Sequence, residues 1–159
     1  MASAGVFTSI AHEVDSRLKN FLGKSAYWLR GIGELSHFKT VTFDITADGK
    51  KFSIDAFLFL VLNSSSVAGF KKISDAAQID DGKLDLLALK KCSASGLVTL
   101  AKKILAGEAV DTDENIFSLQ AAQIEINSTA KLVSDFDGEA GFALPIRIET
   151  LRHAIDFFV

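Results

Sequence analysis

Three Asp-Gly dipeptides divide this sequence, and they constrain its fold more than any other feature. They stand at Asp48-Gly49, Asp81-Gly82 and Asp137-Gly138. Asp-Gly between hydrophobic runs is a strong short hairpin signal, because both central residues of the tightest turns need a positive φ. Repeated turns of this kind predict a chain that is rich in antiparallel strands.

The residues on either side of the first dipeptide fit that prediction. Val41, Phe43 and Ile45 alternate with polar residues, which predicts a strand with one buried face. Residues 52–62 predict a second, largely buried strand on the far side of the turn, and the apolar run 84–89 predicts another after Asp81-Gly82.

Helices are predicted in two parts of the chain. Residues 23–38 carry an apolar stripe at helical spacing, and residues 10–18 predict a shorter helix. Ser93 or Ser95 can cap a third helix that ends at Gly107. The apolar residues predicted to share one face of this helix are Leu97, Leu100, Ala101, Ile104 and Leu105.

The last third of the chain predicts strands alone. They cover residues 116–126, 130–136 and 142–148, and a last short strand is predicted at 155–159. The absence of alternating strand and helix units argues against a doubly wound nucleotide fold. We therefore expect an α+β, mainly β fold: an antiparallel β-sandwich or barrel of hairpins with two to three helical insertions, in a single domain over residues 1–159.

Composition and charge narrow the class of protein. Hydrophobic residues make up 48% of the chain, yet the longest apolar run, residues 56–62, is far shorter than the roughly 20 residues that cross a bilayer as a helix. Cys92 is the only cysteine, which excludes an internal disulfide and fits a reducing cytoplasm. A net charge of -3 argues against a nucleic-acid partner, which needs a basic field.

Two compositional features have both a plain and a functional interpretation. Four lysine doublets are either solvated charges or a cationic face for anionic lipid. Thirteen phenylalanines either pack a core or line an apolar cleft for acyl chains. Composition alone leaves both alternatives open.

An acidic cluster surrounds the third Asp-Gly turn. Asp135, Asp137 and Glu139 crowd around Gly138, and strand alternation would place Asp135 and Asp137 on the same side if the strand continued through Phe136. A carboxylate there could take a proton from an attacking hydroxyl or hold Mg²⁺. The alternative is a plain hairpin turn.

The second Asp-Gly turn is also acidic. Asp80, Asp81 and Asp85 are spaced closely enough to bind a hard cation, although such residues more often cap and solvate a turn. The usual phosphate-binding loops are missing from the sequence, as are zinc-ligand spacings and the nucleophile elbow of hydrolases.

Taken in order, these motifs resemble a known family. The opening residues 4–8 and the stretch 18–27 (Leu-Lys-Asn-Phe-Leu-Gly-Lys-Ser-Ala-Tyr) resemble the start of the C-terminal domain of bacterial diacylglycerol kinases and their sphingosine-kinase-like relatives. Asn63 with its serine loop, the Asp-Asp-Gly turn and the Asp-Gly-Glu turn followed by Pro145 occur in the family's order. The resemblance covers nearly the whole chain.

The resemblance implies a lipid kinase in which an N-terminal domain binds ATP and this domain supplies the lipid side of the cleft. The aspartate of the Asp-Gly-Glu motif, here Asp137, is implied to be the general base, with Glu139 as its neighbour in the site. Some members bind a structural Mg²⁺ through residues that match Asp81, the carbonyl of Lys83 and an acidic residue three positions before Asp81. Gln78 stands at that last position, and its neutral amide weakens the implied metal site.

The Gly-Gly-Asp-Gly-Thr loop of the family's ATP-binding domain is absent, so we expect this chain alone to be inactive. In the full enzyme, we expect the phosphoryl group of ATP to pass, with Mg²⁺, to the hydroxyl of diacylglycerol or a related lipid. That enzyme is expected in the cytoplasm, at the inner face of the membrane. The alternatives are a non-catalytic lipid or apolar-ligand binding module and, less directly, a self-association domain that forms a homodimer.

Overall fold

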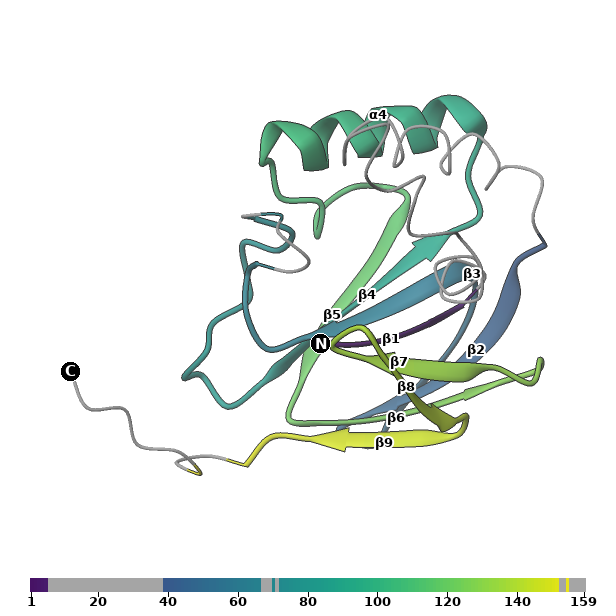
Figure 1. Ribbon diagram of the computed structural model, residues 1–159, viewed down its shortest axis with the longest axis vertical. Helices are drawn as coiled ribbons and strands as arrows, with labels where there is room; N and C mark the ends of the chain where they lie inside the picture. Colours follow the sequence, from purple (N-terminus) through teal and green to yellow (C-terminus); the bar gives the residue numbers. More distant parts are fainter. Residues whose placement is uncertain (6–38, 67–69, 71, 152–153, 155–159) are drawn as a thin grey trace.

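The computed structural model describes residues 1–5, 39–66, 70, 72–151 and 154. Within these ranges the chain forms nine strands and one helix, which appear in Figure 1. The elements are β1 (Ala2–Gly5), β2 (Val41–Ala47), β3 (Lys50–Leu62), β4 (Leu84–Lys90), α4 (Ala94–Ala106), β5 (Ile116–Ala121), β6 (Gln123–Ser128), β7 (Val133–Phe136), β8 (Glu139–Ala143) and β9 (Ile146–Glu149).

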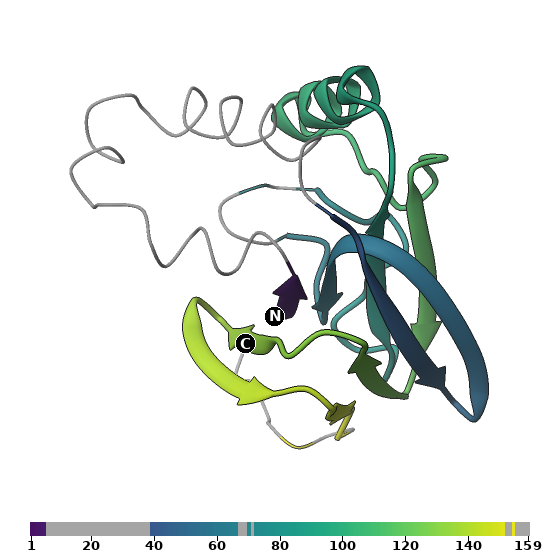
Figure 2. The ribbon, with the colours of Figure 1, turned by 90° about the vertical axis from the view of Figure 1, so that its right-hand side faces the viewer.

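The long strand β3 organises the antiparallel sheet. Its first half pairs with β2, and its second half pairs with β1 on the same edge, while β4 runs along the opposite edge. From β3 the sheet continues through β1, β7 and β8 in one direction and through β2, β6 and β9 in the other. The sheet therefore curls into a nearly closed barrel, as Figure 2 shows in side view.

Hydrophobic side chains fill both sides of the central strands. One cluster fills the inside of the curled sheet, where the rings of Phe43 and Phe59 meet edge to face with centroids 5.2 Å apart. A second cluster packs the opposite face of β3 and β4, through Phe57 and Leu87, against Leu97 of α4. β4 is buried on both faces for this reason, which explains why its sequence reads as an apolar run.

Helix α4 begins and ends where the sequence predicts. Ser93 caps it by accepting a hydrogen bond from the backbone nitrogen of Gly96, and Gly107 ends it in a left-handed conformation with φ of 75°. Leu97, Leu100 and Ala101 are buried as predicted, whereas Leu105 is 43% exposed, so its predicted place on the buried face is wrong.

Strand β1 was not predicted, because its four residues are small and do not alternate. Ala2, Ser3 and Ala4 are buried between β3 and β7. A Cβ on Gly5 would lie 2.4 Å from the carbonyl oxygen of Phe57, so only glycine allows this close approach to β3. Small side chains thus let a strand lie in the middle of the sheet.

Two predicted strands are each divided in the structure. Residues 116–126 form β5 and β6, with a break at Ala122 that turns the chain from β4 toward β2. Residues 142–148 contain the end of β8 and the first three residues of β9, which pair with β7 and β6 respectively. Pro145, which lacks a backbone donor, lies at the change of partner.

The fold class is confirmed as α+β, mainly β, with antiparallel strands in a barrel-like sheet. The helices predicted at 10–18 and 23–38, the stretch 18–27 and the strand predicted at 155–159 lie outside the described residues. Within the described part of the chain, no helix is long and apolar enough to span a bilayer.

Candidate active site at the β7–β8 turn

The third Asp-Gly dipeptide forms the tight turn that joins β7 to β8. Asp137 has a φ of 53° and Gly138 a φ of 93°, as the central residues of a type I′ hairpin turn require. Asp48 and Gly49 form a similar turn between β2 and β3, with φ values of 46° and 80°. The hairpin interpretation of both dipeptides is confirmed.

Asp135 and Asp137 do not lie on the same side, which corrects that expectation. Asp135 is only 9% exposed, and its Oδ1 accepts a hydrogen bond from the backbone nitrogen of Gly138 at 2.9 Å. The side chain of Asp137 is 83% exposed. The alternation ends at Phe136, because the positive φ of Asp137 turns its side chain away from the strand direction.

Asp137 lies directly beside the first residue of the chain. Its Oδ1 is 2.6 Å from the amino nitrogen of Met1, and its own backbone nitrogen donates to the carbonyl oxygen of Met1 at 3.1 Å. Strand β1 causes this contact, since it pairs with β7 and brings Met1 to the turn. Figure 1 shows the N-terminus at this end of β1.

Glu139 begins β8 on the other side of the turn. It pairs with Phe136 across the hairpin and is exposed. No hydrogen bond or ion pair joins its carboxylate to another described residue. The turn therefore presents two exposed carboxylates. That of Asp137 contacts the amino nitrogen of Met1, whereas that of Glu139 faces solvent.

The hairpin behind the turn is tightly built. The Ser134 hydroxyl donates to the carbonyl oxygen of Phe142 at 2.7 Å and accepts from its backbone nitrogen at 3.0 Å, where the register of β7 and β8 shifts. A Cβ on Gly141 would lie 2.3 Å from Cδ2 of Phe136 and 2.8 Å from Oγ of Ser134. Such packing holds the carboxylates of the turn on a rigid support.

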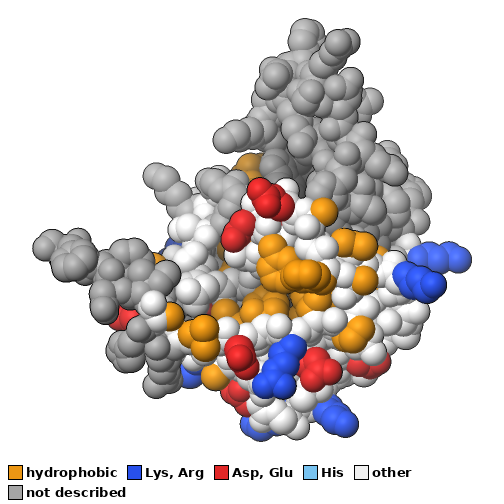
Figure 3. Space-filling view, turned by 60° about the horizontal axis from the view of Figure 1, so that its bottom comes forward, with side chains coloured by type: hydrophobic (Ala, Val, Ile, Leu, Met, Phe, Trp, Pro, Cys, Tyr) orange, Lys and Arg blue, Asp and Glu red, His pale blue; other side chains and the backbone are white. Residues whose placement is uncertain are grey.

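Large hydrophobic side chains are exposed on the same hairpin. Phe142 is 75% exposed and Val133 is 54% exposed, and the ring of Phe142 contacts that of Phe136 with centroids 6.2 Å apart. Figure 3 looks onto the side on which β6, β8 and β9 lie in Figure 1. On that face, hydrophobic side chains gather around a hollow, with acidic groups along its edge.

The Asp81 turn is built differently. Oδ1 of Asp81 accepts a hydrogen bond from the backbone nitrogen of Lys83 at 2.8 Å, and the carbonyl oxygen of Gly82 accepts one from Oγ1 of Thr150 at 2.9 Å. Gln78 is exposed. The three implied ligands would supply one carboxylate, the carbonyl of Lys83 and an amide. In the described ranges, no group of three or more His, Cys, Asp or Glu side chains is able to hold a metal.

Mg²⁺ commonly binds one or two carboxylates and several waters. A donor set with one carboxylate therefore suits Mg²⁺ better than it suits a cation whose ligands must all come from the protein. The proposed metal role of Asp81, Lys83 and Gln78 therefore stays a prediction. The structure places this turn on the loop before β4, apart in sequence and sheet position from the β7–β8 turn.

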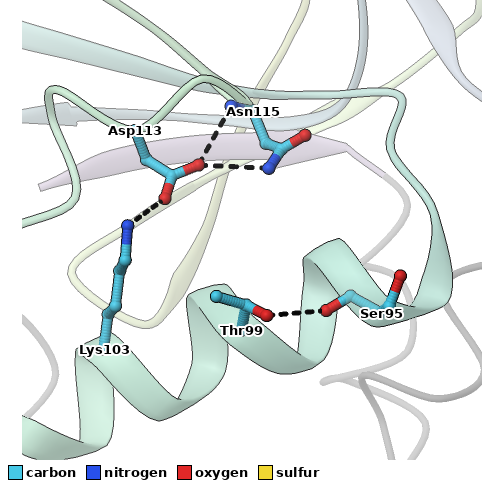
Figure 4. Close-up of polar contacts among 5 residues, drawn as sticks. All are labelled: Ser95, Thr99, Lys103, Asp113 and Asn115. Atoms are coloured by element: carbon cyan, nitrogen blue, oxygen red, sulfur yellow. Dashed lines mark hydrogen bonds and ion pairs between the residues drawn. The ribbon is translucent and has the colours of Figure 1, made fainter.

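Two lysines of the doublets have ion-pair partners: Lys72 with Asp75 and Lys103 with Asp113. Nζ of Lys103, in the last turn of α4, lies 2.6 Å from Oδ2 of Asp113, as Figure 4 shows. Oδ1 of Asp113 accepts hydrogen bonds from the backbone and side-chain nitrogens of Asn115 at 3.0 and 3.1 Å. Burial alone would raise the pKa of Asp113, but these hydrogen bonds and the charge of Lys103 together lower it. This lysine fastens the helix to the loop before β5.

Comparison with known proteins agrees with the fold. The YegS C-terminal NAD kinase beta sandwich-like domain matches residues 1–159. A diacylglycerol kinase of Bacillus subtilis is 34% identical over 91% of this chain and 48% of its own length, and one of Staphylococcus aureus (strain bovine RF122 / ET3-1) is 32% identical over 99% and 50%.

A solved structure is also similar. The crystal structure of a putative diacylglycerol kinase from Bacillus anthracis str. Sterne matches 94% of this chain and 49% of its own chain, with a TM-score of 0.71 and 28% sequence identity. The chain thus spans about half the length of the curated relatives that it matches. It belongs to the YegS C-terminal NAD kinase beta sandwich-like domain family, whose relatives include bacterial diacylglycerol kinases.

Proposed function

We propose that this domain forms the acceptor side of an ATP-dependent lipid kinase, with Asp137 as the general base toward the hydroxyl of diacylglycerol or a related lipid. The observation that carries the proposal is the position of Met1 beside the turn, where the backbone nitrogen of Asp137 donates to the carbonyl oxygen of Met1 at 3.1 Å. Relatives named diacylglycerol kinase are about twice as long as this chain, and the matching family is a C-terminal domain. A preceding domain would therefore join this one directly beside the Asp137 carboxylate.

The proposed reaction needs few groups from this domain. The lipid oxygen bonds to the γ-phosphorus, the bond from that phosphorus to the β–γ bridging oxygen breaks, and the hydroxyl proton passes to the carboxylate of Asp137. Nucleotide and Mg²⁺ would be held by the preceding domain, where the metal neutralises charge on the phosphates. Asp135 and Gly138 would hold Asp137 in place, and Glu139 would help to organise the site.

The exposed hydrophobic side chains support a lipid as the acceptor. A contiguous apolar surface beside polar groups commonly marks a site for a ligand, a membrane or another protein. Phe142 and Val133 lie on the hairpin that carries the proposed base, so an acyl chain packed there would keep its hydroxyl near the turn. We propose that the enzyme works from the cytoplasm at the inner face of the membrane.

The coding sequence offers a first test. The proposal expects an in-frame Gly-Gly-Asp-Gly-Thr segment ahead of the codon for Met1, within a domain of about the same length as this chain. A stop codon directly upstream, with no such domain encoded beside it, would contradict the two-domain enzyme.

The exposed apolar hairpin also favours a second candidate, a lipid-binding module without catalysis. Sedimentation with vesicles that contain diacylglycerol separates the two. A plain binding module should bind as well alone as in the longer protein, and Phe142→Ser should abolish that binding. In a kinase, the longer protein should bind more tightly, and it should convert diacylglycerol to its phosphate when ATP is present.

A further inference from the structure

A buried aspartate lies in the middle of the hydrophobic face that α4 and its loops cover. Asp85 follows Leu84 in β4 and shares the face of Leu87 and Leu89, which pack beneath α4. Only 2% of Asp85 is exposed. Its Oδ1 accepts a hydrogen bond from Nε2 of Gln120 at 3.0 Å, whereas its buried Oδ2 has no hydrogen-bond partner.

A second buried aspartate comes from the loop between α4 and β5. Asp111 is 9% exposed, and its Oδ2 accepts hydrogen bonds from Oγ of Ser74 and from the backbone nitrogens of Asp75 and Ala76, at 3.0, 2.9 and 3.1 Å. Its Oδ1 is buried and has no hydrogen-bond partner. Two carboxylates in this part of the molecule therefore each leave one oxygen unsatisfied.

The two carboxylates are linked through Ala76. The Gln120 amide that donates to Oδ1 of Asp85 also donates to the carbonyl oxygen of Ala76, whose backbone nitrogen donates to Oδ2 of Asp111. Burial is the main cause of a raised pKa at Asp85. The negative charges of Asp81 and Asp111 raise this pKa further, whereas the Gln120 amide and the Ser74 hydroxyl lower it. Ser74 is fully buried and hydrogen-bonded to Asp111, so it lies beside both aspartates. Gln120, which also donates to the carbonyl oxygen of Ala76, links the same loop to β5.

Among the residues that the structure describes, no buried Lys, Arg or His balances these charges. The charge of Lys72 interacts with that of Asp111, but the Lys72 ammonium is paired with Asp75 at 2.7 Å and its side chain is 51% exposed. A buried carboxylate without a partner is costly, and two beside each other are more so. A cation bound at the two unsatisfied oxygens would balance these charges.

We propose that Asp85 and Asp111 bind one hard divalent cation, Mg²⁺ or Ca²⁺, through Oδ2 of Asp85 and Oδ1 of Asp111. Carboxylate oxygens are the ligands that these ions prefer, and water can fill the remaining positions. The cation joins β4 to the loop between α4 and β5. This site does not depend on the proposed kinase reaction, and it uses neither Asp81 nor Gln78.

Equilibrium dialysis of the chelator-treated chain against MgCl₂ or CaCl₂, with metal content measured by atomic emission, tests the proposal. We expect one ion per chain and a higher melting temperature in the presence of the ion. Asp85→Asn and Asp111→Asn should each weaken binding by about tenfold or more, because even groups behind the ligands commonly contribute that much. Ser74→Ala keeps both carboxylates and should still bind.

Asp81→Asn is the matched control, because it removes a carboxylate from the adjacent turn. It should leave the bound ion in place. Loss of the ion in Asp81→Asn alone would assign it to that turn and overturn the proposal, as would failure of the wild-type chain to bind either ion at millimolar concentration. If Asp111→Asn does not fold, Asp85→Asn decides the question. Tb³⁺ that binds to this variant with the same affinity and luminescence lifetime as to the wild-type chain would also refute the site.

Discussion

The carboxylate of Asp135 accepts a hydrogen bond from the backbone nitrogen of Gly138 at 2.9 Å. A buried side chain in β7 thereby holds the turn that displays Asp137. In the proposed reaction the base must stay in one place relative to the acceptor hydroxyl, and a general base acts only within hydrogen-bond reach of its proton. Asp135 is thus a positioning residue, and Asp137 the group that would contact the substrate.

Replacement of Asp135 should show this division of roles. Asp135→Ala leaves the Gly138 N–H without its partner and should lower the free energy of unfolding by about 1–3 kcal/mol. Asp135→Asn keeps an oxygen at the acceptor position and should cost clearly less. Urea unfolding measures both values, and equal losses in the two variants would contradict the assigned hydrogen bond.

Two glycine substitutions should have opposite effects on stability. Gly141→Ala places a Cβ against Phe136 and Ser134 and should lower the free energy of unfolding by about 1–3 kcal/mol, as overpacking commonly does. Gly96 lies in the first turn of α4, where a Cβ would meet only ordinary contacts at 3.5 Å. Gly96→Ala should therefore stabilise the chain by up to about 1 kcal/mol, because alanine favours the helix. Thermal unfolding of both variants checks the signs.

The ion pair of Lys103 with Asp113 should make stability depend on pH. Because the pKa of Asp113 is lowered in the folded chain, its contribution is complete above the unfolded value of about 3.9 and is lost as pH falls through the lower folded value. Asp113→Asn should therefore cost about 1 kcal/mol near neutral pH and much less in acid.

Denaturant unfolding of the wild type, Asp113→Asn and Lys103→Met across the acid range measures this difference. The lysine variant keeps part of the aliphatic stem but removes the charge. A penalty for Asp113→Asn that stays constant as the pH falls would contradict the role of the ionised carboxylate.

Sequence patterns predicted those elements that depend on residues close together in the chain. Helix α4 follows from Ser93, its apolar stripe and Gly107, and the β2–β3 hairpin follows from Asp48-Gly49, since each depends on neighbours along the chain. The Asp137 turn was predicted in the same way, although the side on which its carboxylate lies was not.

Long-range contacts explain what the sequence could not predict. The break between β5 and β6 is held by Asp48, whose two carboxylate oxygens accept hydrogen bonds from the backbone nitrogens of Ala122 and Gln123 at 3.2 and 3.0 Å. Nothing near Ala122 indicates that contact. Likewise, Asp85 looked like part of an acidic turn, because only the tertiary structure shows β4 covered on both faces and Asp111 beside it.

Steady-state kinetics on the full reading frame, with ATP and diacylglycerol, test the proposed base most directly. Asn adopts a positive φ nearly as readily as Asp, so Asp137→Asn should keep the turn and lower kcat by about 10²–10⁴-fold with little change in the KM for lipid. Asp48→Asn, at the similar turn between β2 and β3, should retain turnover. A kcat for Asp137→Asn within about twofold of the wild type, or a large loss confined to Glu139→Gln, would contradict the assignment of the base to Asp137.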